Sequence, residues 1–328
     1  MLLAFANPIL VTKNFFKLFY VKINAATSGY KTNCMLPVIF KDARYFQIIF
    51  QSVFLGYGIF FLHWNADWWL YATYFTISIL SQFLCELFIP KKATVTIPLL
   101  QRIKFGFPSI LISSVGLSLL LKTNYWYVAA LAATISIFSK YIICCKGKHI
   151  FNPSALGIVV AVLCTGKAWF SPGQWGSSTV ILFAVLCLGV IVVTRVQKLA
   201  VSLAFLLTYA GLLFIRQIIY LQWPIDFFIQ SISTGSLLLF SFFMITDPKT
   251  TPNHPVARIV WAVAVAAIAF YLSAFKFMNG TPLWVLVFSQ PLVPLLDKLF
   301  KGRVFEWRPP KSSKGGLEGN SKIIESYC

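Results

Sequence analysis

Charged residues are scarce in this chain of 328 residues, and acidic residues are the scarcest of them. Charged side chains make up 11% of the sequence, whereas a soluble domain typically has about 25%. Only 9 Asp and Glu stand against 28 Lys and Arg, and 58% of all residues are hydrophobic. This composition excludes an ordinary cytosolic enzyme and a disordered protein, and it indicates an integral membrane protein whose main partner is the lipid bilayer. The excess of 19 positive charges is expected in loops on one side of the membrane and does not imply a nucleic-acid partner.

The sequence also lacks the motifs of the common enzyme classes. It contains no GxSxG, HExxH, P-loop or GxGxxG motif. The seven cysteines do not have the spacing of a four-ligand metal site, and the adjacent pair Cys144 and Cys145 is interpreted as two small apolar residues. We therefore predict no catalytic residue and no metal site, and we expect any chemistry to come from a bound cofactor.

Long hydrophobic runs are abundant. A helix that spans a bilayer needs about 20 mainly apolar residues, and ten segments approach this length. The sequence therefore predicts an all-α membrane domain of about ten transmembrane helices over residues 46–300. An interfacial arm over 1–45 precedes it, and a polar cytoplasmic tail over 301–328 follows it. The ten segments are 46–62, 69–89, 106–121, 125–145, 151–164, 177–193, 199–215, 228–246, 257–275 and 282–299.

The basic residues predict the orientation of these helices. With ten spans both termini lie on the same side, and most Lys and Arg residues fall in the loops of that side. Because positive loops stay in the cytoplasm, we predict that both termini are cytoplasmic and that the chain lies in the inner (plasma) membrane. Most of the ten tryptophans fall in the opposite loops, as is typical of an aromatic belt.

Two pairs of segments have similar ends. Segment 151–164 begins with Asn152 as a candidate N-cap and Pro153 as the first helical residue, and segment 282–299 follows a similar Asn-Gly-Thr-Pro sequence. Segments 106–121 and 228–246 both end an apolar run at a polar residue and a Thr. These pairs predict two inverted five-helix repeats with broken helices, a transporter plan with the site at the repeat interface. The alternative is that the Asn-Pro pair is a plain helix start.

Two motifs resemble a known family. KHIFNPSALG at 148–157, followed by SFFMITDPKTTP at 241–252, resembles the D subunit of Rnf-type electron transport complexes and is similar to the B subunit of the sodium-pumping NADH:quinone oxidoreductase. The resemblance covers roughly residues 45–300. It implies a ten-helix fold with inverted repeats, distantly like urea and ammonium channels. It also implies a bound flavin, partner redox subunits and electron transfer coupled to ions.

The chain departs from this family at the flavin attachment site. The family attaches FMN covalently to a threonine in an SGAT-like motif, and the nearest residues here are Ser177, Ser178 and Thr179, which lack the Gly-Ala-Thr sequence. We therefore expect any FMN or riboflavin to be bound non-covalently. The predicted function is a membrane subunit of a flavin-dependent electron transport system without a catalytic domain of its own. The alternatives are a solute channel or transporter on the same fold, and a structural assembly factor.

The candidate cofactor-binding residues lie in the two motifs. The start of the helix at Asn152 could offer N–H groups to a flavin phosphate or another anion, and Lys148 could add charge. Asp247 could orient the edge of a flavin ring. The structural alternatives are a capped helix near the lipid surface and a capped loop. The full set of candidates is Lys148, His149, Asn152, Pro153, Ser154, Thr246 and Asp247.

Glu86 is a candidate for an ion pathway. A carboxylate within a membrane span is costly and is a functional hypothesis by default. Pro90 follows four residues later, so the alternative is a position close to the cytoplasmic interface. Lys140, in the fourth segment, is expected either to pair with Glu86 or to extend toward the surface.

Overall fold

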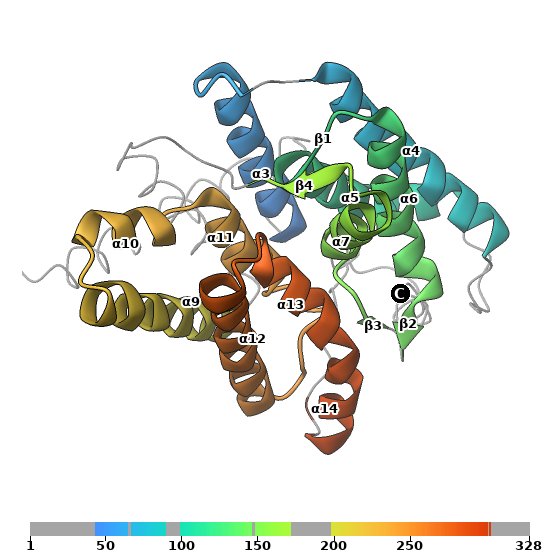
Figure 1. Cartoon of the computed structure of the whole chain (residues 1–328). Helices are drawn as coiled ribbons and strands as arrows, with labels where there is room; N and C mark the ends of the chain where they lie inside the picture. The colour runs from blue at the N-terminus through green and yellow to red at the C-terminus, as the bar shows by residue number, and fades with distance from the viewer. Residues whose placement is uncertain are drawn as a thin grey trace, which may run out of the picture. The chain divides into compact units, whose positions relative to one another are not determined.

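The computed structural model describes residues 43–64, 67–89, 99–145, 148–171, 198–300 and 302. These residues are mostly helical, as the sequence predicts (Figure 1). Residues 1–42 of the predicted arm, the segment 177–193 and the tail from residue 303 lie outside the described residues. The α-helices are α3 (Ala43–Phe60), α4 (Trp68–Phe88), α5 (Leu99–Leu120), α6 (Trp126–Ile142), α7 (Pro153–Thr165), α9 (Leu199–Phe214), α10 (Ile225–Ile232), α11 (Gly235–Leu239), α12 (Pro255–Lys276), α13 (Thr281–Ser289) and α14 (Val293–Leu299). The π-helical segments η1 (Ile215–Tyr220) and η2 (Phe240–Met244) continue α9 and α11, and the 3₁₀ segment η3 (Gln290–Leu292) continues α13.

The described parts of the predicted hydrophobic segments are mainly helical, and strands occur only at the segment ends, at Leu121 and Cys144–Cys145. By length and composition, two helices can cross a bilayer, Leu199–Tyr220 and Pro255–Lys276. The pair Ile225–Ile232 and Gly235–Met244 adds a third if it forms one bent span. The described residues therefore support a helical protein with two or three membrane spans, and the number of ten stays a prediction.

Two of the predicted segments contain a break. α10 and α11 meet at an angle of 47° around Ser233 and Thr234. α13 ends at Ser289, and the chain continues through η3 into α14. Pro291 lies in η3 and has no N–H for the α-helical ladder. The local change of pitch therefore follows directly from the sequence.

α7 and α13 pack against each other, and contacts near both ends indicate that they run in opposite directions. At one end, the N–H of Asn152, just before α7, donates to Oε1 of Gln290, just after α13, at 2.9 Å. At the other end, the ring of Phe170, after α7, lies 5.6 Å from the ring of Trp284 in α13. Gly280 has a φ of 66°, and a Cβ at this position would overlap the Phe170 ring. The fifth and tenth predicted segments thus form an antiparallel pair.

α6 and α7 cross closely at Gly157. A Cβ on Gly157 would lie 2.5 Å from the carbonyl oxygen of Ala132 and 2.7 Å from Oγ of Ser136. The Ser136 hydroxyl also donates to the carbonyl oxygen of Pro153 at 2.6 Å. The absence of a side chain at Gly157 therefore allows α6 to hold the start of α7.

Two short antiparallel strand pairs flank α7. β3 (Lys148–His149) precedes α7 and pairs with β2 (Cys144–Cys145), and β4 (Ala168–Phe170) follows α7 and pairs with β1 (Leu121–Thr123). The sequence analysis did not predict these strands, because strands of two or three residues are too short to show an alternating pattern.

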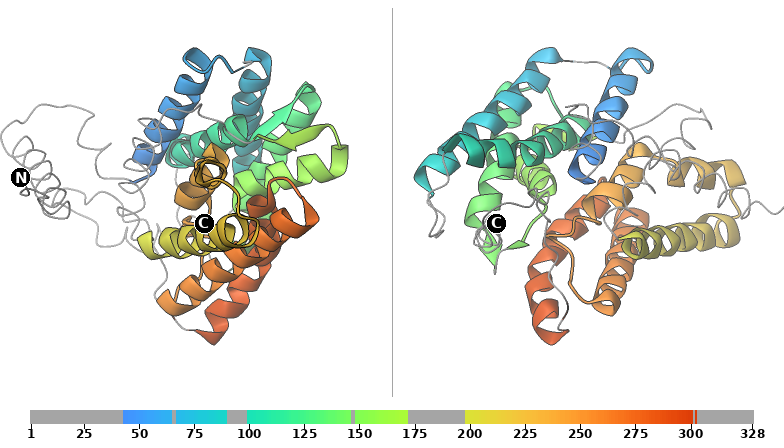
Figure 2. Two further views of the ribbon diagram at one scale, coloured as in Figure 1. Left: turned by 60° about the vertical axis from the view of Figure 1, so that its left-hand side comes forward. Right: turned by 180° about the vertical axis from the view of Figure 1, so that it is seen from behind.

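The helices pack through aromatic and small apolar side chains. α9 lies beside α12, and α4 lies beside α6 (Figures 1 and 2). Phe205 of α9 contacts Phe240 of η2, with 4.9 Å between ring centroids, and both side chains are fully buried. This packing fixes the position of the residues that follow η2.

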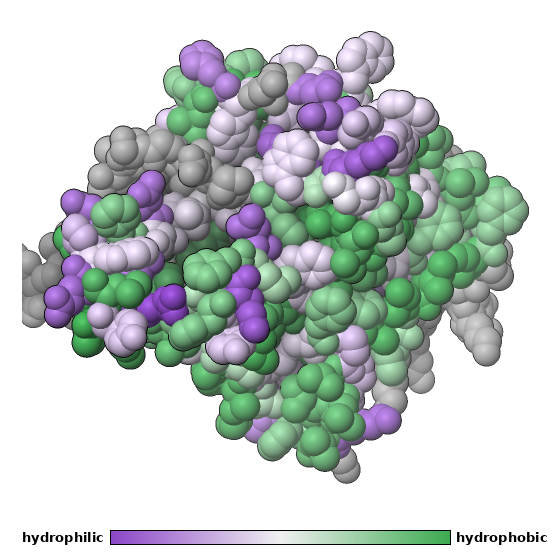
Figure 3. Space-filling view, in the orientation of Figure 1, coloured by the Kyte–Doolittle hydropathy of each residue, from purple (hydrophilic) through white to green (hydrophobic). Residues whose placement is uncertain are grey.

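Large apolar side chains also cover much of the outside. Trp69, Tyr220 and Phe277 are each more than 80% exposed. In Figure 3 the hydrophobic residues extend over α12–α14 in the lower part of the view and along α4 on the right. Soluble monomers rarely expose such large apolar areas, whereas the lipid-facing surface of a membrane protein does.

Candidate functional site

Asn152 joins three elements at the start of α7. Its side-chain oxygen accepts a hydrogen bond from the N–H of Ala155 at 3.2 Å, so it is the N-cap that the sequence predicts. Its backbone N–H donates to Gln290 Oε1. Its side-chain nitrogen Nδ2 lies 3.5 Å from the carbonyl oxygen of Met244. Gln290 is fully buried. The Asn152 N–H is therefore already engaged, although the sequence analysis proposed it as a donor to a phosphate.

Pro153 and Ser154 are buried and contact neighbouring helices. Pro153 occupies the first helical position, as predicted, and its carbonyl oxygen accepts from Ser136. The hydroxyl of Ser154 donates to the carbonyl oxygen of Ser113 in α5 at 3.4 Å. Both residues thus help to pack α7 against α5 and α6.

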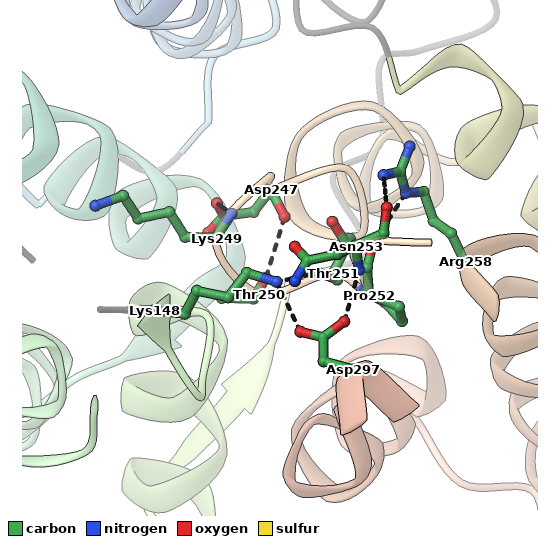
Figure 4. A network of polar contacts seen from close by, with 9 residues as sticks. All are labelled: Lys148, Asp247, Lys249, Thr250, Thr251, Pro252, Asn253, Arg258 and Asp297. Atoms are coloured by element: carbon green, nitrogen blue, oxygen red, sulfur yellow. Dashed lines mark hydrogen bonds and ion pairs between the residues drawn. The ribbon is translucent and has the colours of Figure 1, made fainter. Parts of the chain in front are cut away.

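Lys148 forms an ion pair with Asp297. Its amine lies 3.0 Å from Oδ2 of Asp297 and donates to the carbonyl oxygen of Thr251 at 3.0 Å (Figure 4). The other carboxylate oxygen of Asp297 accepts from the N–H of Asn253 at 2.7 Å. One carboxylate therefore connects β3, α14 and the loop that follows η2.

His149 contacts the neighbouring strand β2. It is half-buried, and its Nδ1 lies 3.6 Å from Sγ of Cys144 in the paired strand. The thiol of Cys144 also donates to the carbonyl oxygen of Lys140 at 2.8 Å. His149 therefore belongs to the β2–β3 turn.

Asp247 organises the loop after η2. Its Oδ1 accepts from the N–H of Lys249 at 3.0 Å, and its carbonyl oxygen accepts from the N–H groups of Thr250 and Thr251, both at 3.2 Å. Thr246, just before it, is buried and donates to the carbonyl oxygen of Phe242. These are the bonds of a capped turn, which was the structural alternative for Asp247.

The electrostatic surroundings of Asp247 are unusual. Burial raises the pKa of the Asp247 carboxyl, and the N–H and charge of Lys249 and the charges of Lys140 and Lys198 oppose this shift. Asp247 therefore lies among several cations at a place with little water.

Lys198 and Arg258 are site residues that sequence reasoning missed. Arg258, in the first turn of α12, donates to the carbonyl oxygens of Pro252 at 3.1 Å and Asn253 at 2.8 Å. Lys198 precedes α9 and is only 4% exposed. Burial lowers the pKa of Lys198 to about 7, and the charges of Arg258 and Lys148 act in the same direction. In the sequence both residues were only two of many cations in loops.

Glu86 and Lys140 do not pair, which was one of the two alternatives for Lys140. Glu86 is buried near the end of α4 and accepts a hydrogen bond from the hydroxyl of Tyr141 at 2.6 Å. The amine of Lys140 donates instead to the carbonyl oxygen and hydroxyl of Ser109 and to the hydroxyl of Ser113, at 2.8–3.0 Å. The Lys140 amine does not reach the surface, because these oxygens of α5 accept its hydrogen bonds between the two helices.

A cavity of about 310 Å³ lies at the opposite end of α13, next to the break between α10 and α11. Sequence reasoning placed no site here, because its hydroxyl groups come from segments that are distant in the sequence. Its lining residues include Phe170, Ser171, Tyr209, Ser231, Thr234, Ser236, Ser273, Asn279 and Thr281.

Comparison with known proteins concerns the loop that contains Asp247 and the helices around that loop. Residues 163–306 match the model of the NQR2, RnfD, RnfE family. This match supports the resemblance that the motifs predicted, and the second motif, at 241–252, lies within it. The matched part contains α9–α14, the Asp247 loop and the cavity-lining residues of these helices. Lys148 and Asn152 lie before it.

Two curated relatives of this family resemble a shorter stretch. The D subunit of an ion-translocating oxidoreductase complex from Stutzerimonas stutzeri is 27% identical over 74 residues. A protein of the same name from Halorhodospira halophila is 31% identical over 74 residues. Each match covers 23% of this chain and 21% of the relative, so the likeness extends over about a fifth of each relative's length.

Proposed function

We propose that this protein is a membrane subunit of an ion-translocating oxidoreductase complex. The family match over residues 163–306 carries this proposal. The matched part includes the loop at which Asp247 and Asp297 meet cations from several elements. Two relatives that match 74 residues of this chain are named as the D subunits of such complexes. Because a subunit works within its complex, we expect the redox partners of this chain to be other subunits.

The proposed membrane architecture has ten helices in two inverted repeats. Both termini would lie in the cytoplasm, with the protein in the inner membrane. The antiparallel pair α7 and α13 supports the repeats, since segments five and ten of an inverted repeat must run in opposite directions. The bent pair α10 and α11 supports the broken helices.

The proposed cofactor is a non-covalent FMN or riboflavin. At the start of α7 the fit is poor, because the Asn152 N–H and the Lys148 amine already have protein partners. The cavity beside α13 fits better. Its volume is near the lower end of small-molecule sites, and Phe170 and Tyr209 offer aromatic surface beside several hydroxyl donors. A flavin bound there would supply the electron transfer, and these residues would hold and orient it.

The test is purification of the protein in mild detergent together with its associated subunits. We expect a flavin absorption spectrum, a free flavin in the mass spectrum of the extracted small molecules, and co-purified redox proteins. Denatured protein should show no flavin fluorescence in a gel. A fluorescent band that disappears in Thr179→Ala would contradict non-covalent binding.

A solute channel or transporter on the same fold is the second candidate. The hydroxyl-rich cavity at a helix break favours it, because such breaks line substrate sites in transporters. A colourless protein without redox partners that moves a solute into liposomes would support this candidate and contradict the first.

A further inference from the structure

The N-terminal ends of α9 and α12 bring together more cations than carboxylates. Lys198 directly precedes α9, and Arg258 lies in the first turn of α12. Lys148, Asp247 and Asp297 are the other charged groups that act on Lys198. Three cations therefore accompany two carboxylates in a region where Lys198 itself is almost fully buried.

Lys198 differs from the other two cations in having no partner among the residues that the structure describes. Lys148 pairs with Asp297, and Arg258 donates to the carbonyl oxygens of residues 252–253 (Figure 4). The Lys198 amine has no hydrogen bond or ion pair with any residue that the structure describes. The Lys198 side chain is almost fully buried, and an added anion would give its charge a partner.

Two further features of this region favour an anion. The first turns of α9 and α12 have no side-chain caps, so N–H groups such as those of Leu199 and Val256 have no capping side chain. Both helices belong to the candidate spans Leu199–Tyr220 and Pro255–Lys276. The ends of such spans lie at the depth of lipid headgroups, where phosphate groups are abundant.

We propose that Lys198 binds a phosphate group between the N-terminal ends of α9 and α12. Arg258 and Lys148 add positive potential, and the lysine amine is a common phosphate ligand in proteins. The phosphate belongs either to an anionic lipid headgroup or to a soluble phosphate compound. The proposal requires a membrane location and does not require electron transfer, so it can fail or succeed independently of the proposed function.

The experiment measures the binding of both phosphate sources to the purified protein. Thermal unfolding is recorded in nanodiscs of phosphatidylcholine, with or without phosphatidylglycerol, and in phosphate-free detergent with increasing inorganic phosphate or FMN. Lys198→Met removes the charge and keeps the length of the side chain, and Lys198→Arg keeps the charge. Lys276→Met is the matched control, because it removes an exposed lysine at the opposite end of α12.

We expect at least one source to raise the midpoint of unfolding of the wild-type protein. Lys198→Met should weaken this response about tenfold or more in apparent Kd, since it removes a charge-assisted hydrogen bond. Lys198→Arg and Lys276→Met should keep it. A response to phosphatidylglycerol alone identifies a lipid, and a response to inorganic phosphate or FMN identifies a soluble ligand. The proposal is wrong if the wild-type protein responds to neither, or if Lys198→Met and Lys276→Met respond equally.

Discussion

At the scale of single residues, Gln290 has the most consequential position. It is fully buried between α13 and α14, and its side-chain oxygen accepts the N–H of Asn152, which is 138 residues earlier in the sequence. One amide therefore connects the start of α7 with the break after α13. Both are parts of the candidate site.

Gln290→Leu is expected to reduce the free energy of unfolding by about 1 kcal/mol. The change leaves the buried N–H of Asn152 without its acceptor. Part of that cost is offset, because the Gln290 amide nitrogen has no partner among the described residues. Thermal unfolding in detergent measures the loss. Gln217→Leu is the control, since it breaks only a side-chain bond to Ser231, and an equal loss in both variants would contradict this role of Gln290.

The sequence predicted one of the two partners in the contact between Asn152 and Gln290. Asn152 and Pro153 were predictable as a helix start, because N-cap and first-position preferences are local. Gln290 was not predictable, because a single glutamine in an apolar segment has no local pattern and its partner is distant. Lys198 was also missed, since the burial of a loop cation depends on which helices pack around it in the folded protein.

Lys198 predicts a pH dependence of stability. Burial lowers the pKa of Lys198 to about 7 from 10.5, with Arg258 and Lys148 acting in the same direction and Asp247 and Asp297 opposing it. Between these two values the unfolded chain binds more protons than the folded one, so this group makes the protein more stable as pH rises. Unfolding in phosphate-free detergent from about pH 7 to 9.5 measures this trend. In Lys198→Met the stability should depend less on pH, and an unchanged pH dependence would contradict this role of Lys198.

At the scale of elements, the close crossing of α6 and α7 determines where the candidate site can form. Gly157 allows this crossing, because a Cβ there would meet the backbone oxygen of Ala132. The hydroxyl of Ser136 then fixes the carbonyl of Pro153. A shift of α7 would therefore move Asn152 away from Gln290.

Gly157→Ala should destabilise the protein, although Gly to Ala within a helix usually stabilises by up to about 1 kcal/mol. The added methyl group must push α7 away from backbone atoms that cannot rotate aside. Gly211→Ala in α9 is the control, because no atom lies within 4 Å of a Cβ there. The two substitutions should shift the midpoint of thermal unfolding in opposite directions. A stabilised Gly157→Ala variant would show that the crossing is looser than described.

At the scale of the whole molecule, composition and segment length predicted the helical class correctly. The spacing of similar helix starts also indicated the pair α7 and α13, which the structure shows to be antiparallel. The polar network around Asp297 was beyond sequence reasoning. It depends on three segments that meet only after the helices pack, and each contributes ordinary polar residues.

The predicted orientation is tested with reporters joined after Cys328. Green fluorescent protein should fluoresce at this position, and alkaline phosphatase, which is active only outside the cytoplasm, should be inactive. The physical reason is the retention of basic loops in the cytoplasm. Active phosphatase with dark fluorescent protein would overturn the even number of spans.

The opposite directions of α7 and α13 also have an electrical consequence. Each helix is a dipole with a partial positive charge at its first residues and a partial negative charge at its last. The beginning of α7 meets the end of α13 at Gln290, and Phe170, five residues after the end of α7, contacts Trp284 in the first turn of α13. The two dipoles therefore largely cancel at both ends of the pair. This pair therefore adds little net field along its own axis, so charged side chains at its ends contribute most of the local potential.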